Sequence, residues 1–306
     1  MRVYRGFPVA SDDHVALTIG NFDGVHRAHQ AMLARVTEAA SDLRLAPAVL
    51  TFDPHPREFF ARDRAPARLS TLRAKLEHFS AAGVARVYVM RFNAALAALT
   101  AHEFIERVLR LTLRVRWILV GDDFRFGNDR RGDLALLRES ARDFSVEAMP
   151  TLLVNGERAS SSAVRAALGA GDLERAAALL GRPFSIAGHV AHGEKLGTGL
   201  GFPTANIALR HKPALSGVFA VRVRGLGPSP RGGVASLGVR PTVKAGARPL
   251  LEVFLFDFNE SIYGKRVEVE FLHKLRDEER YPGLDALKQQ MRIDAAQARQ
   301  YLATHP

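Results

Sequence analysis

The first half of the chain alternates apolar runs with segments of helical periodicity. Residues 15–19 and 48–52 are short and nearly all apolar, which is typical of strands buried on both faces of a parallel sheet. Residues 30–40 between them have apolar positions at helical spacing. The further elements expected are a helix over 71–82 that ends at Gly83, a strand over 87–90, a helix that begins with a capping box at Thr100, a strand over 117–120, and a helix from Asp172 to Leu180. This alternation predicts an α/β domain built from βαβ units.

In the second half of the chain, the apolar residues recur at every second position. Residues 221–224 and 267–271 alternate strictly between apolar and charged positions, which predicts antiparallel strands with one solvent-exposed face. No long helical pattern returns until residues 282–302. Because the period changes after a Gly-Arg-Pro break, we place a domain boundary near Phe184. The two expected domains are an α/β domain over residues 1–184 and a small antiparallel β-barrel with a C-terminal helix over residues 185–306.

Three loops of the first domain are candidates for a ligand site. Ligands of parallel sheets bind beyond the carboxyl ends of the strands. In this chain those ends are followed by residues 20–23, 53–56 and 121–124, which are all rich in Gly, Pro, Asn or Asp. We therefore expect these loops to form the site.

The segment from Gly20 to His29 joins a buried strand to a helix. Exposed backbone N–H groups at the start of a helix, together with the positive end of its dipole, bind anions. His26 and His29 are three residues apart, so they share one helical face and both can donate to one phosphate. Taken alone, such a pair is better explained as ordinary surface or half-buried histidines, and a zinc site is disfavoured because no third ligand lies nearby. The position at a strand end favours phosphate binding.

A glycine-rich segment opens the second domain. Residues 193–201 hold four glycines, which let a backbone approach phosphates closely, but they lack the Gly-Lys-Ser/Thr ending of a Walker A loop. Thr204 and Asn206 follow on an extended segment, and their side chains point the same way. Their oxygens are hard ligands that suit Mg²⁺. Taken alone, a turn-forming Pro-Thr followed by a strand-end Asn explains the same residues.

Composition narrows the classes of protein. The formal net charge of +11 invites a nucleic-acid partner, yet the basic residues are scattered and mostly arginine, which disfavours one. The absence of cysteine excludes disulfides, iron–sulfur clusters and thiolate zinc sites. No apolar run in the sequence is long enough to span a membrane, and the amino terminus lacks the apolar core of a signal peptide. We expect a cytoplasmic protein with no membrane partner.

Four motifs in the first half resemble a known family. They are residues 20–29, 51–56, 120–127 and 160–165. They occur in the order seen in bacterial bifunctional riboflavin kinase/FAD synthetases. The resemblance covers about residues 15–182 and implies a Rossmann-like nucleotidylyltransferase domain that adenylylates FMN. Two departures from the family pattern are Ala28, where glycine is usual, and Ser162, where threonine is usual.

The resemblance also implies roles for residues of the first domain. His26 and His29 would hold the phosphates of ATP, and Arg165 would bind their β/γ end; alone, a surface salt bridge explains Arg165 equally well. The further residues implied to bind nucleotide or flavin are Gly20, Asn21, Phe22, Asp23, Gly24, Asp123, Ser161 and Ser162, with Pro54, Pro56, Phe60 and Phe126 facing the flavin ring. Ordinary loop packing is the alternative for the last four.

Four motifs of the second half resemble the riboflavin kinase module of the same family. They are residues 201–206, 238–242, 251–258 and 275–278. The resemblance covers about residues 185–303, implies a six-stranded barrel and favours Thr204 and Asn206 as metal ligands. In that family, the glutamate that matches Glu252 removes the proton from the terminal ribityl hydroxyl. The residues implied to bind nucleotide are Gly193, Lys195, Gly197, Gly201 and Arg276.

Glu252 also has a simpler explanation. Because Leu251 and Val253 alternate around it, it can be an ordinary outward-pointing carboxylate of a strand. The departures from the kinase pattern are Ser236, Thr198 and Phe254, at positions that often carry asparagine, arginine and histidine. None of them removes a proposed ligand or base, although Thr198 is expected to weaken a contact to the nucleotide phosphates.

The sequence favours a chain that carries both activities. It would phosphorylate riboflavin to FMN with ATP and then adenylylate FMN to FAD, releasing pyrophosphate, with Mg²⁺ in both steps. Two alternatives stay open: a chain with only one active module, and a basic regulatory protein that binds flavin or RNA without turnover. Assembly into a homo-oligomer is also left open.

Overall fold

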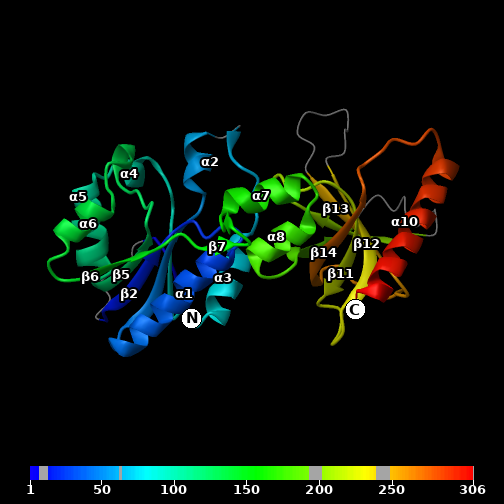
Figure 1. Ribbon diagram of the computed structural model, residues 1–306. Helices are drawn as coiled ribbons and strands as arrows, with labels where there is room; N and C mark the ends of the chain where they lie inside the picture. The colour runs from blue at the N-terminus through cyan, green and yellow to red at the C-terminus, as the bar shows by residue number, and fades with distance from the viewer. Residues whose placement is uncertain (7–12, 62–63, 193–201, 239–248, 306) are drawn as a thin grey trace. The chain divides into compact units, whose positions relative to one another are not determined.

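The computed structural model describes residues 1–6, 13–61, 64–192, 202–238 and 249–305 (Figure 1). The chain divides into two compact units. The first comprises Met1–Pro66 and Ser70–Ser160, and the second comprises Ala67–Leu69 and Ser161–Pro306. In these described ranges, no helix has the length and apolar character needed to cross a membrane.

The first unit is built on a six-stranded sheet in which every neighbouring pair is parallel. In spatial order the strands are β1 (Arg2–Arg5), β4 (Arg86–Met90), β3 (Ala46–Phe52), β2 (Val15–Ile19), β5 (Val115–Gly121) and β6 (Ser145–Met149). The four strands expected from apolar runs are all present. The edge strands β1 and β6 carry mostly exposed and half-buried residues, so the apolar pattern does not indicate them.

Helices cover both faces of this sheet, as the apolar strands predict. The helices are α1 (Arg27–Asp42), α2 (Pro56–Phe60), α3 (Leu72–Ala81), α4 (Ala94–Ala97), α5 (Ala101–Glu103), a π-helix η2 (Phe104–Thr112), a 3₁₀-helix η3 (Asn128–Arg130) and α6 (Leu134–Ser140). On one face Leu17 of β2 shares a buried cluster with Ile105 of η2. On the other, Val49 of β3 shares a cluster with Leu33 of α1 and Phe79 of α3.

The helix starts follow the sequence signals. The Thr71 hydroxyl accepts a hydrogen bond from Ala74 N at 3.2 Å and caps α3. Thr100 and Glu103 form the expected reciprocal capping box. One difference is that the helix after Thr100 soon continues as the π-helix η2, for which the sequence carries no signal.

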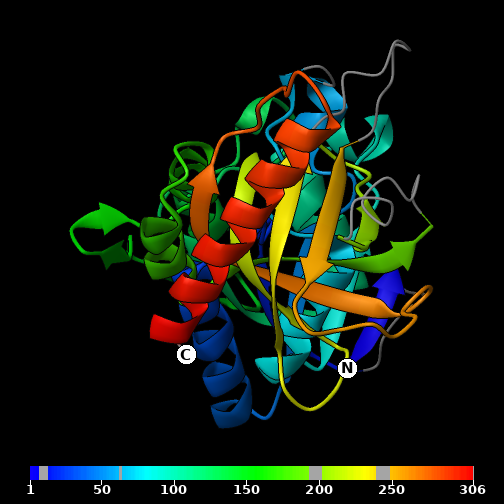
Figure 2. The same cartoon turned by 90° about the vertical axis from the view of Figure 1, so that its right-hand side faces the viewer.

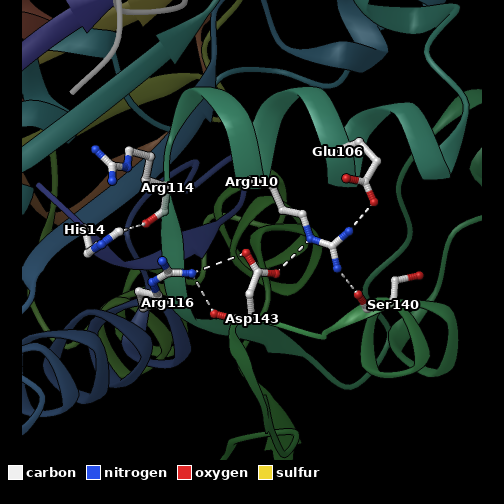
Figure 3. A network of polar contacts seen from close by, with 7 residues as sticks. All are labelled: His14, Glu106, Arg110, Arg114, Arg116, Ser140 and Asp143. Atoms are coloured by element: carbon white, nitrogen blue, oxygen red, sulfur yellow. Dashed lines mark hydrogen bonds and ion pairs between the residues drawn. The ribbon is translucent and has the colours of Figure 1, made fainter. Parts of the chain in front are cut away.

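Figure 3 shows the polar network that fixes η2 within the first unit. Arg110 of η2 donates to Asp143 Oδ1 at 2.8 Å, and also to Ser140 O and Glu106. Arg116 of β5 donates to the backbone oxygen and to Oδ2 of Asp143, at 3.0 and 3.2 Å. This network lies at the amino end of β5, the edge of a parallel sheet opposite to the one that binds ligands. Its role is therefore structural.

The second unit contains a closed barrel of antiparallel strands. Around the barrel the strands are β10 (Thr204–Ala208), β13 (Leu250–Leu255), β12 (Arg231–Gly238), β11 (Gly217–Arg224), β14 (Arg266–Arg276) and β9 (Phe184–Ala191). The helices of this unit are α7 (Ser161–Gly169), α8 (Leu173–Leu180) and α10 (Leu284–Thr304). Phe219 and Phe271 are fully buried and pack edge to face, with ring centroids 5.2 Å apart. The six strands match the expected barrel.

Helix α10 covers part of the outer face of the barrel, along which it lies in Figure 2. Its Ala298 shares a buried cluster with Ala220 of β11 and with Phe256. Residues 221–224 show the alternation that the sequence predicts: Val221 and Val223 are buried, Arg222 is half-buried and Arg224 is exposed. Helix α10 packs against β11 as well as β12 and β14.

The second unit begins before the boundary that we expect at Phe184, the first residue of β9. Helix α8 packs against α7 and against strands β9 and β14. Its buried residues are Leu173, Ala176, Leu179 and Leu180. A kinase domain over residues 185–306 remains our prediction, and α7 and α8 add packing to its barrel.

We predict that the fragment 161–306 is more stable than the fragment 185–306. Each leucine of α8 that the shorter fragment loses contributes about 1.5–3 kcal/mol of buried apolar surface, and part of that surface lies against the barrel. Urea unfolding of both fragments, followed by far-UV circular dichroism, should give a higher midpoint for the longer one. Equal midpoints would mean that α8 adds nothing to the stability of the barrel.

Candidate active sites

The loop after β2 has an uncommon backbone conformation. Phe22, Gly24 and Val25 have positive φ angles of 50°, 82° and 42°, which are rare for residues other than glycine. Hydrogen bonds hold the loop in place: Ser70 N donates to Asp23 Oδ1 at 3.0 Å, and Gly24 N donates to Ser70 Oγ at 2.9 Å. Backbone held in such conformations clusters at functional sites.

Asn21 is anchored at the base of the same loop. Its backbone oxygen accepts hydrogen bonds from Lys75 Nζ at 3.1 Å and from Thr51 Oγ1 at 3.3 Å. The buried Asn21 Oδ1 has no hydrogen-bond partner among the described residues. The backbone is thus fixed, while the hydrogen-bonding capacity of the side-chain oxygen is unused within the described residues.

The loop lies where the strand order reverses. From β2 the chain passes to β3 and β4 on one side, and then to β5 on the other side of β2. Open α/β sheets bind ligands at such a switch point, outside the carboxyl ends of the strands. The loops after β2 and β5, predicted as ligand loops, therefore flank the position that the topology favours.

His26 and His29 stack on each other at the start of α1. Their ring centroids are 3.6 Å apart and the rings are inclined by 21°, and the Phe22 ring lies 4.9 Å from that of His29. Burial lowers the pKa of His29 well below its usual value, and the charges of His26 and Lys75 lower it further. The structure therefore brings the predicted pair together and keeps His29 neutral near neutral pH.

Two residues of the loop after β5 already have protein partners. Asp123 forms an ion pair with Arg158 at 2.5 Å. Phe126 is buried and packs against Phe104 and Phe124, with ring centroids 5.7 and 5.4 Å apart. The flavin contact of Phe126 and the ligand contact of Asp123 stay predictions.

An aromatic cluster lies where β3 and β4 end. The ring centroid of Phe92 is 5.8 Å from that of Phe52 and 5.6 Å from those of Phe59 and Phe60. Phe60 is 69% exposed, so its ring is available to stack on a flat ligand. The nearby Pro54 and Pro56 are half-buried. Sequence analysis misses Phe92, although an aromatic residue shortly after a strand end is a usable signal.

Arg165, Ser161 and Ser162 lie in α7, which belongs to the second unit. Arg165 Nε donates to Ala67 O at 2.6 Å, within that unit. This bond fixes the direction of the guanidinium. The role of all three residues at the phosphates stays a prediction.

Three polar residues, which we call the polar row, lie side by side across the barrel. Glu252 of β13 is directly opposite Asn206 of β10 and Ser236 of β12. Residues paired in this way have their side chains on the same face, with Cβ atoms about 4.5–5.5 Å apart. Leu251 and Val253 are buried on the other face, so the polar row lies on the outer face of the barrel.

Asn206 is the buried member of the polar row, with 6% of its surface exposed. Its Nδ2 donates to Thr204 O at 3.2 Å, while Oδ1 has no partner in the described part of the chain. A buried oxygen without a partner is costly unless a ligand satisfies it. The Thr204 side chain lies on the same face of the strand. This pair of hard oxygen donors fits Mg²⁺.

Arg276 has an internal partner that the sequence does not indicate. Its Nε donates to Asp294 Oδ1 at 3.0 Å, and its Nη2 donates to Oδ2 at 2.7 Å. Burial acts to lower the pKa of Arg276, but hydrogen bonding and the charge of Asp294 raise it. A role of Arg276 at the nucleotide stays a prediction.

The glycine-rich segment and one kinase motif fall outside the described residues. The predicted residues concerned are Gly193, Lys195, Gly197, Gly201 and Thr198, together with positions 239–242 of the motif over 238–242. Their roles stay predictions from the sequence.

Comparisons with known proteins cover both units. Residues 9–163 match the family of FAD synthetases, and residues 180–302 match that of riboflavin kinases. The bifunctional riboflavin kinase/FMN adenylyltransferase of Escherichia coli (strain K12) is 45% identical, over 98% of this chain and 98% of its own length. The chain belongs to this family of bifunctional enzymes.

Two further relatives agree with the assignment to the bifunctional riboflavin kinase/FMN adenylyltransferase family. The family member from Pseudomonas fluorescens is 46% identical over 98% of this chain and 97% of its own. A solved structure titled a macrolide-efflux protein from Streptococcus pneumoniae is 27% identical, with a TM-score of 0.80 over 95% of this chain and 97% of its own. The resemblance inferred from the eight sequence motifs is confirmed.

We predict that the first unit loses stability below about pH 6.5 and that His29 is one cause. Because the folded pKa of His29 lies below its usual value, the unfolded chain binds the proton first as the pH falls through about 6.5. The contribution of the neutral His29 ring to the free energy of unfolding is complete above that pH. It is lost as the pH falls toward the lowered pKa. Scanning calorimetry from about pH 5 to about pH 8 should show a shallower decline for His29→Gln.

The matched control is His102→Gln, which changes an exposed histidine of α5. This variant should keep the slope of the unchanged chain. Equal slopes for the unchanged chain and His29→Gln would contradict the assignment of the effect to His29.

Proposed function

We propose that this chain makes flavin cofactors in two steps. It transfers the γ-phosphoryl group of ATP to riboflavin, which gives FMN and ADP, and then transfers AMP from a second ATP to FMN, which gives FAD and pyrophosphate. The observation that carries this proposal is the match of both family models, in order, along a chain that is 45% identical over nearly its whole length to a relative named for both activities. Mg²⁺ as the metal and a cytoplasmic setting are parts of the same proposal.

In the adenylylation, the attacking group is the phosphate of FMN. It is already an anion and needs no strong base. The obstacle is to bring two anions together and to stabilise the charge on the α-phosphate and on the departing pyrophosphate. His26 and His29 at the amino end of α1, with its backbone N–H groups, would donate to these phosphates. Arg165 would bind the β/γ end.

The protonation of His29 bears on this role. Without a ligand, burial opposes the protonation of His29, and the stacked His26 ring and Lys75 oppose it further. A bound phosphate supplies the opposite charge and so favours the protonated ring. His29 can therefore gain a proton, and a second N–H donor, when the nucleotide is present.

In the phosphorylation, the attacking group is the neutral terminal hydroxyl of the ribityl chain, so a positioned base is required. Glu252 would accept the hydroxyl proton while the oxygen bonds to the γ-phosphorus and the bond to the β-phosphate oxygen breaks. Thr204 and Asn206 would hold Mg²⁺, which neutralises phosphate charge when it is bound. The pairing of Asn206 opposite Glu252 supports these roles, because base and metal ligand then face one reacting group.

We predict that FMN appears before FAD when the chain is incubated with riboflavin and ATP. Both products should require a divalent metal, because each step breaks a phosphoanhydride bond of ATP, whose phosphate charges a hard cation neutralises. The measurement is chromatographic separation of the flavins over time, with and without a chelator and with Mg²⁺ added back. FMN that accumulates without FAD, even when FMN and ATP are supplied directly, would contradict the bifunctional assignment.

We predict a crossed pattern for two single changes. Glu252→Gln keeps the shape of the side chain but cannot take the proton, so FMN formation should fall roughly 10²–10⁴-fold while FAD formation from supplied FMN continues. His29→Ala removes a donor to a charged transition state, so FAD formation should fall roughly 10²–10³-fold while FMN formation continues. Rates of both half-reactions in both variants are the measurement.

Two variants serve as matched controls for this pattern. Glu260→Gln changes an exposed carboxylate of the second unit, and His102→Ala an exposed histidine of the first, so both reactions should continue. If Glu252→Gln slowed both reactions equally, or His29→Ala left FAD formation intact, the assigned roles would be wrong.

A further inference from the structure

The segment 277–283 joins β14 to α10, and Arg276 holds it. Besides its hydrogen bonds to Asp294, Arg276 donates through Nη1 to Asp277 O at 2.9 Å. The guanidinium also lies over the Tyr281 ring, 5.6 Å from its centroid. One side chain therefore contacts the segment at two points and ties it to α10.

Asp294 is built into α10 as the partner of Arg276. It is 2% exposed, and Gln290 Nε2 donates to its Oδ1 at 2.9 Å. Arginine bound by both carboxylate oxygens is held in position and direction more firmly than by a single contact. The position of the segment thus depends on a buried carboxylate of the C-terminal helix.

Glu278 belongs to this segment and lies next to the polar row. Ser236 Oγ lies 3.3 Å from Glu278 Oε1. A Cβ atom on Gly238 would overlap the Glu278 carboxylate, so the glycine leaves the space that the carboxylate occupies. An ionised carboxylate only accepts hydrogen bonds, so the hydroxyl of Ser236 donates to Glu278.

The hydrogen bond to Glu278 determines whether the Ser236 hydroxyl donates to Glu252, which lies directly opposite on β13. A serine hydroxyl has one proton to donate. While that proton is given to Glu278, it does not compete with the substrate hydroxyl for the oxygens of Glu252. Without Glu278, the same hydroxyl can turn and donate to Glu252.

We propose that Glu278 is a positioning residue of riboflavin phosphorylation, which keeps the Ser236 proton away from the base Glu252. The Arg276–Asp294 pair holds Glu278 in place for this task. The proposal rests on the proposed function of Glu252 as the base. It adds no bond-making step, because Glu278 acts only through Ser236.

The test is a double-mutant cycle on the full chain, with the rate of FMN formation as the measurement. Glu278→Gln removes the charge that attracts the Ser236 proton and should lower kcat roughly 3- to 10-fold, with a smaller change in the KM for riboflavin. In a Ser236→Ala chain, no hydroxyl competes for Glu252, so the further change Glu278→Gln should have no effect. A purely structural role of Glu278 does not predict this dependence on Ser236.

Asp294→Asn tests the support of Glu278. Like Glu278→Gln, it should slow FMN formation, and again only when Ser236 is present. The matched control is Asp285→Asn, which changes an exposed carboxylate of the same helix and should leave the rate unchanged. FAD formation from supplied FMN should stay constant in all variants, because that reaction is assigned to the first unit, and far-UV circular dichroism of each variant checks that the second unit is folded.

Three results would overturn the proposal. They are an unchanged rate in Glu278→Gln, an equal loss from Glu278→Gln with and without Ser236, and a rate in Asp294→Asn equal to that of the unchanged chain. Because Glu278 is exposed, its variant tests the proposal even if Asp294→Asn fails to fold. An unchanged chain that makes no FMN would instead contradict the proposed function.

Discussion

Pairing between buried strands is the constraint on which both candidate sites depend. In the first unit β2 is paired with β3 on one side and β5 on the other, and all its residues are buried. The loop that follows Ile19 therefore starts from a fixed point at the switch of strand order. In the barrel, the same kind of pairing sets Asn206, Glu252 and Ser236 in line, and a slip of one residue would turn Glu252 to the other face.

In the proposed mechanism the two sites use different electrostatics, and the ionisation of each attacking group explains why. FMN phosphate arrives as an anion, so the loop after β2 offers N–H groups and the stacked His26 and His29, which suit the binding of negative charge. The ribityl hydroxyl arrives neutral, so the barrel offers the carboxylate of Glu252.

Most elements of the fold follow from the sequence because their signals are local. The short apolar run over residues 15–19 predicts β2, and Thr71 and the Thr100 capping box predict two helix starts that the structure contains. Contacts between distant segments could not be predicted: the cover of β11 by α10, and the Phe92 cluster. The alternation of side chains along each strand places Glu252 and Asn206 on the outer face. Only the register of the strands shows that the two residues lie directly opposite each other.

Ser236 shows how a departure from the family pattern changes the chemistry around it. Asparagine, often found at this position, has two N–H donors and a carbonyl oxygen, so it can serve two neighbours at once. Serine has a single proton, and the neighbour that receives it is set by the surroundings. Here Glu278 lies 3.3 Å from the hydroxyl and Gly238 leaves it room. In the proposed mechanism, the serine at this position thus makes the base Glu252 depend on a carboxylate from the segment that Arg276 and Asp294 hold.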